Sequence, residues 1–94
     1  MEKLLEEQEA LYKKSERIEN DLYKLTGFYF PNPRILYYKA ADNEITPDDF
    51  VKAFSLMFEY RIVRKDIFVI NAEIEEIKKE LEKWLNENRS FLHN

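Results

Sequence analysis

The fold is decided by residues 45–91, ITPDDFVKAFSLMFEYRIVRKDIFVINAEIEEIKKELEKWLNENRSF, a stretch with no glycine and no proline after Pro47. Thr46 is a typical N-cap residue, and proline is favoured at the first position of a helix. Ile45 and Phe50 have the spacing of a hydrophobic staple around that cap. We therefore expect a helix that begins at residue 47.

Apolar residues recur through this stretch in alternating steps of three and four, which is the pattern of an amphipathic helix. The positions of this seam are Ala53, Leu56, Tyr60, Val63, Ile67, Ile70, Ile74, Ile77, Leu81, Trp84, Asn88 and Phe91, and only Asn88 is polar.

One helix over residues 53–91 would be about 57 Å long, whereas a compact domain of this size has a radius of gyration of about 12–13 Å. We therefore favour a break, either at residues 64–66 or at Asn71. Two alternatives stay open: a continuous helix, and a small β-hairpin over residues 61–70 that turns at residues 64–66.

A second helical pattern covers residues 2–25, with Leu4, Leu11, Ile18 and Leu25 one heptad apart. Gly27 is suited to end that helix, since glycine readily adopts positive φ.

A short helix is expected over residues 33–41, after the Asn32–Pro33 start signal. If residues 4–25 pack against residues 67–91, then Phe50, Phe54, Phe58 and Tyr60 are left to cover the aromatic residues of 28–38. The predicted fold is all-α: a single domain over residues 1–94, built as a three- to four-helix bundle with a long C-terminal helical hairpin or a broken long helix.

Charge argues against several classes of function. The formal net charge is −4, and neither end of the chain nor its middle has an excess of basic residues. Binding to nucleic acid or to an anionic membrane is therefore not the default expectation. The longest uninterrupted apolar run, residues 67–70, is too short to span a bilayer, and we expect a cytoplasmic protein.

The residues needed for common catalytic and metal sites are scarce. The chain has no cysteine, and its one histidine, His93, is next to the last residue. Glu73, Glu76 and Glu80 share a helical face, but that face is the polar one, where solvated carboxylates are the simpler interpretation. Gly27 stands alone, so no phosphate-binding loop is present. We expect no enzyme, no cofactor and no metal site.

A helical protein–protein interaction module is the favoured function: an adaptor, inhibitor, immunity or regulatory protein that binds a protein partner or a second copy of itself. Fourteen aromatic residues exceed what one small core can bury, so some should be exposed. The candidate partner-binding residues are Phe28, Tyr29, Phe30, Tyr37, Tyr38, Ile70, Ile74 and Ile77.

The alternative function is a nucleic-acid-binding transcriptional regulator. Arg61, Arg64 and Lys65 form the densest basic group in the chain. At the tip of a hairpin wing, or on a helix, they could contact a phosphate backbone.

Overall fold

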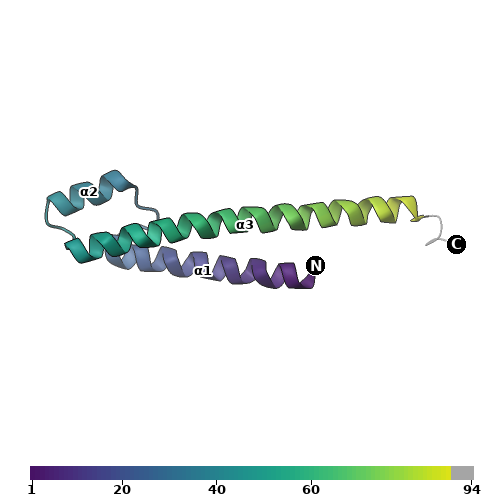
Figure 1. Cartoon of the computed structure of the whole chain (residues 1–94), viewed down its shortest axis with the longest axis horizontal. Coiled ribbons are helices and arrows are strands. Elements are labelled where there is room, and N and C mark those ends of the chain that lie inside the picture. Colours follow the sequence, from purple (N-terminus) through teal and green to yellow (C-terminus); the bar gives the residue numbers. More distant parts are fainter. Residues whose placement is uncertain (90–94) are drawn as a thin grey trace.

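A computed structural model describes residues 1–89, and in this part of the chain all regular structure is helical. The helices are α1 (Glu2–Thr26), α2 (Pro33–Ala41) and α3 (Pro47–Glu87). α1 and α3 lie side by side, and α2 lies over the end where they are joined (Figure 1). The molecule is extended, measuring 73 × 20 × 15 Å with a radius of gyration of 20.7 Å.

The ends of the helices follow the signals in the sequence. The Asn32 side chain accepts a hydrogen bond from the backbone N–H of Ile35 (2.9 Å), and the Thr46 side chain accepts one from that of Asp49 (3.1 Å). Both caps are followed by proline at the first helical position. Gly27 ends α1 with φ of +82°, a conformation that costs a residue with a side chain more than it costs glycine.

α3 is one continuous helix of 41 residues, so the expected break and the alternative β-hairpin were both wrong. Arg64, Lys65 and Asp66 are solvent-exposed, while Val63 and Ile67 on either side of them are buried. The charged group therefore occupies outward positions of an unbroken turn. The break was expected because a helix this long does not fit within a compact domain of this size. The molecule is extended, so this limit on the length of the helix does not apply.

α1 packs antiparallel against α3 from the first turns of α3 to about Ile77. The two helices bury Ile18, Leu22, Ala53, Val63 and Ile67 between them, and Ile74 is the last buried residue of α3. The expected pairing of residues 4–25 with residues 67–91 was therefore wrong. The short connection through α2 returns the chain beside the end of α1, so α3 has to pair with α1 from its own first turns.

Polar contacts fix the register of α1 on α3. Gln8 Nε2 donates to Asn71 Oδ1 (2.7 Å), and Asn71 Nδ2 donates to the Tyr12 hydroxyl (3.3 Å). Farther along, an ion pair joins Lys14 to Glu59 (3.5 Å). An ion pair this exposed contributes little stability, but buried or half-buried amides disfavour a shifted register in which they lack partners.

α2 and the connector before it close the other end of the seam. Leu36 of α2 is completely buried, and the Tyr37 ring lies 5.6 Å from the Phe50 ring and 5.9 Å from the Phe54 ring. The Phe30 ring lies 5.6 Å from that of Tyr60. Three of the four residues expected to cover the aromatic segment thus contact it. Phe58 is largely exposed.

No helix within residues 1–89 is both long enough and apolar enough to cross a membrane.

The register of α3 can be tested with two neighbouring residues of opposite exposure. Ile67 is 3% exposed and Phe68 is 75% exposed. Ile67→Ala should lower the free energy of unfolding by about 2–4 kcal/mol, because it leaves a cavity in the seam. Phe68→Ala should change it by less than about 0.5 kcal/mol. Urea denaturation followed by circular dichroism measures both, and equal losses would contradict this packing.

The continuity of α3 can be tested by measuring a distance. The chain has no cysteine, so spin labels can be attached at Lys52→Cys and Lys83→Cys alone. An unbroken helix should separate the two labelled backbone positions by about 46 Å. Double electron–electron resonance would measure this separation. A main distance below about 30 Å would show that the helix folds back on itself.

Candidate interaction surfaces

The C-terminal end of α3 extends beyond α1. Because Gln8 lies against Asn71, counting six residues from that pair sets Glu2, the first residue of α1, against Ile77. Residues 78–87, which we call the arm, therefore have no helix beside them (Figure 1). At 1.5 Å per residue the arm is about 15 Å long.

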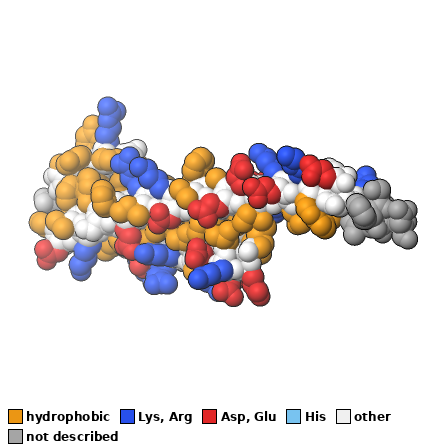
Figure 2. Space-filling view, turned by 45° about the vertical axis from the view of Figure 1, so that its right-hand side comes forward, with side chains coloured by type: hydrophobic (Ala, Val, Ile, Leu, Met, Phe, Trp, Pro, Cys, Tyr) orange, Lys and Arg blue, Asp and Glu red, His pale blue; other side chains and the backbone are white. Residues whose placement is uncertain are grey.

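The apolar seam of α3 continues onto the arm without a helix to cover it. Leu81 is 54% exposed, Trp84 53% and Leu85 39%. Figure 2 shows hydrophobic side chains along one edge of the projecting end and charged side chains along the other. This hydrophobic edge is on the same side of α3 as α1, which packs against the middle of that helix. The arm thus presents the same kind of surface that α1 binds elsewhere.

The three isoleucines predicted to bind a partner lie mostly under α1. Ile74 is buried, while Ile70 and Ile77 are half-buried. The intramolecular contact with α1 already covers much of the seam at these positions. Whether the exposed parts of Ile70 and Ile77 contact a partner stays a prediction.

The aromatic residues of the aromatic segment, residues 28–38, are exposed as expected. Phe30 is 65% exposed and Tyr38 69%, and Phe28, Tyr29 and Tyr37 are also exposed. Several of these rings are nevertheless held in place. The Tyr29 ring stacks on Tyr23 at a centroid distance of 4.5 Å, and the Lys39 ammonium lies 5.5 Å from the centre of the Phe28 ring. The segment therefore offers apolar area on rings whose positions are fixed.

A hollow of about 250 Å³ lies between the aromatic segment and α3. Its wall combines apolar and aromatic side chains with one cation, and the lining residues are Leu22, Tyr29, Phe30, Pro31, Pro33, Met57, Tyr60 and Arg61. This volume is below the usual range for small-molecule sites. The hollow is closer in size to a single side chain.

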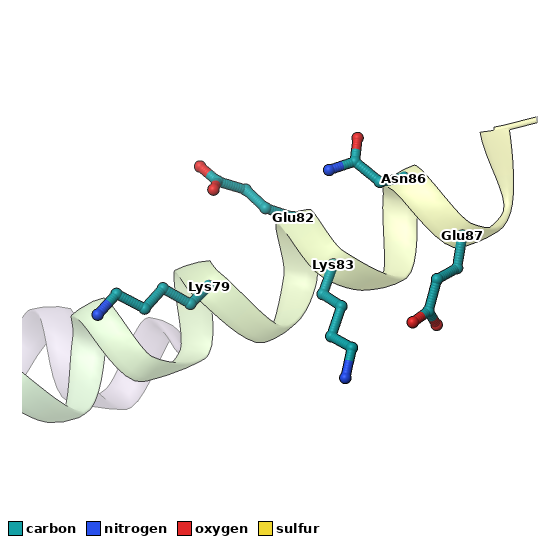
Figure 3. Close-up of a pocket in the computed structure, with 5 residues that line it drawn as sticks. All are labelled: Lys79, Glu82, Lys83, Asn86 and Glu87. Atoms are coloured by element: carbon teal, nitrogen blue, oxygen red, sulfur yellow. The ribbon is translucent and has the colours of Figure 1, made fainter.

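A second hollow, on the arm, contains no converging groups. It is lined by Lys79, Glu82, Lys83, Asn86 and Glu87. Figure 3 shows Glu82 and Asn86 pointing to one side of the helix and Lys83 and Glu87 to the other. Side chains that diverge in this way cannot surround a ligand.

Arg61, Arg64 and Lys65 lie on the solvent-exposed surface of α3 rather than on a wing. The three side chains project from one stretch of helix, and the two that are four apart, Arg61 and Lys65, lie on one face. Within residues 1–89 none of them forms an ion pair.

The described residues contain no group of three or more histidine, cysteine, aspartate or glutamate side chains that could hold a metal ion. His93 lies outside the described residues. Glu73, Glu76 and Glu80 are exposed on α3, as the sequence indicated.

A polar group in the α1–α3 contact involves Tyr60. Its hydroxyl donates to Glu19 Oε1 (3.1 Å), and the buried Ser15 hydroxyl lies 3.5 Å from the same oxygen. Burial raises the pKa of Tyr60 above its ordinary value, and the hydrogen bond to Glu19 and the negative charge of that carboxylate raise it further. Arg64 acts in the opposite direction. The hydrogen bond from Tyr60 to Glu19 thus joins α3 to α1 within the seam.

Sequence reasoning did not select the arm residues Leu81, Trp84 and Leu85 as a contact surface. Leu81 and Trp84 were part of the recognised seam, but their exposure depends on where α1 ends along α3. The amide pair Gln8 and Asn71 could have indicated this register, since Gln8 interrupts the apolar seam of α1 and Asn71 lies directly beside the seam of α3.

Comparisons of the chain with protein-family models, with curated proteins and with solved structures found no match.

The contact between Tyr60 and Glu19 should make stability depend on alkaline pH. Because the pKa of Tyr60 is raised in the folded protein, its contribution is fully present below about pH 10 and is lost as the pH rises through the folded pKa. Tyr60→Phe should therefore flatten the alkaline decrease of the urea midpoint. Tyr38→Phe, at an exposed ring, is the control and should leave the decrease unchanged. The same slope in wild type and Tyr60→Phe would contradict the assignment.

Proposed function

We propose that this chain is a helical protein–protein interaction module, an adaptor, inhibitor or regulatory protein that acts through the arm and the aromatic segment. The single observation that supports this most is the exposed seam of the arm. The apolar side chains of the arm follow the helical seam and are about half exposed. Because α1 covers the same seam on the neighbouring stretch of α3, this surface is suited to bind another helix.

The aromatic segment supports the same proposal independently. Aromatic side chains are enriched among the residues that carry most of the energy of protein interfaces. Phe30 offers such a side chain on the connector beside a hollow of side-chain size, and Tyr38 offers another on α2. The Phe30 ring already packs on Tyr60, so it loses little conformational freedom on binding, which favours affinity.

An enzymatic function has no comparable support: the side chains around the arm hollow diverge, and the Tyr60 hydroxyl is paired with Glu19. Nucleic-acid binding through Arg61, Arg64 and Lys65 stays a prediction that no observation favours. The net charge of −4 opposes it.

Affinity purification of the tagged protein from its native cells tests the proposal. We expect one stoichiometric protein partner, or a second copy of the chain. Recovery should fall about tenfold with Leu81→Ser and Trp84→Ser together, or with Phe30→Ser and Tyr38→Ser together, as expected when central interface residues are truncated.

Phe68→Ser is the matched control, because it removes an exposed ring outside both surfaces. Recovery that is insensitive to all the variants, or a bound component that nuclease removes, would contradict the proposal.

A further inference from the structure

A row of acidic residues runs along α3 beside its seam. Asp66, Glu73 and Glu80 are seven residues apart, and the same spacing extends the row back to Glu59 and forward to Glu87. Residues seven apart lie almost above one another on a helix, so the row follows one flank of the seam. The apolar neighbours of the row, four residues after each acid, are Ile70, Ile77 and Trp84.

Among the described residues, only the first acid of this row is paired. Glu59 binds Lys14 of α1, at a distance of 3.5 Å. Asp66, Glu73 and Glu80 are exposed and form no ion pair within residues 1–89. Asp66 and Glu73 have no basic residue three or four positions away on α3 that could compensate their charge.

The basic residues of the arm lie on different sides of it. Lys79 lies on the outer side of the helix, away from the seam, and Lys78 lies on the opposite flank, where it pairs with Glu75 (3.8 Å). Lys83 lies next to the acidic row, three residues after Glu80 and four before Glu87, and it points to the same side of the helix as Glu87 (Figure 3). Within residues 1–89 Lys83 forms no ion pair with the acids of the row.

From this arrangement we propose that the arm binds a basic amphipathic helix of a partner protein, which continues the path of α1 along the seam. The apolar face of that helix would cover Leu81, Trp84 and Leu85, and its lysine or arginine row would lie against Glu73 and Glu80. Within the chain, the Lys14–Glu59 pair is an example of such a contact, in which a basic residue of α1 pairs with an acid of the row on α3. This inference rests on the proposed function and adds the chemistry of the partner.

A second copy of this chain fits the surface less well. A parallel copy in register would occupy the space that α1 fills beside Ile67 and Ile74. An antiparallel copy would set the two glutamate rows against each other, because the equivalent flanks face one another in antiparallel helix pairs. Like charges across such a contact are repulsive.

Two synthetic peptides make the test. Each has three heptads with isoleucine and leucine at the seam positions and no tryptophan; one carries lysine at both flanking positions and its twin carries glutamate. Like charges on both flanks disfavour self-association of either peptide. Trp84, the single tryptophan of the chain, lies in the proposed surface and reports burial through a blue shift of its emission.

We expect the lysine peptide to bind the full chain with a blue shift of Trp84 emission and the glutamate peptide to bind at least about tenfold more weakly. The triple variant Glu73→Lys, Glu80→Lys, Glu87→Lys should reverse this preference, since individually weak ion pairs act together along one flank. The control variant Glu16→Lys, Glu75→Lys, Glu82→Lys changes the net charge equally at exposed positions away from the row, and should keep the preference for the lysine peptide.

Three results would overturn the inference: equal binding of both peptides, equal effects of the two triple variants, or a dimer by analytical ultracentrifugation in which Trp84 is already buried. If neither peptide binds while the purification described above recovers a partner that depends on Phe30 and Tyr38, the inference fails and the proposed function stands. If the purification recovers no partner, the proposed function itself fails.

Discussion

The structure depends on one contact, the apolar seam between α1 and α3, and on the unequal lengths of the two helices that share it. α1 has 25 residues and α3 has 41. Burial of aliphatic side chains such as Ile18, Leu22 and Ile67 supplies the main favourable free energy that holds the helices together. α2 and the aromatic connector close one end of this contact, and nothing within the described residues closes the other. The extended shape and the exposed arm both follow from that difference.

The function proposed here follows from the kind of surface that remains once the seam is formed. A chain this small has little interior, and its interior is occupied by the α1–α3 seam and by Leu36. What it can offer to another molecule is therefore on the outside: rings held by stacking on one end, and a helical seam with an acidic flank on the other. Both are suited to contacts with protein side chains, and neither encloses a small ligand.

The sequence predicted local structure well and global arrangement poorly. The caps at Asn32 and Thr46 and the stop at Gly27 are decided by neighbouring residues, so local rules located them. The register of α1 on α3 is decided by pairing between residues some sixty positions apart, such as Gln8 and Asn71, which an apolar period cannot specify because every heptad looks alike. The assumption of a compact domain then favoured a break that α3 does not have. The exposed aromatic segment was predicted from composition, whereas the arm as a surface was not, since it exists only in the correct register.

The hydrogen bond between Gln8 and Asn71 has a consequence beyond holding two side chains together. If α1 slid one heptad toward the C-terminal end of α3, it would cover Leu81, and the helical seam would still offer apolar side chains to it. Gln8 would then face Lys78, and Asn71 would lose its amide partner among apolar neighbours. A contact that adds little to total stability therefore selects one among several alignments of similar apolar burial. By selecting the alignment, this hydrogen bond also determines how many turns of α3 stay accessible beyond the end of α1.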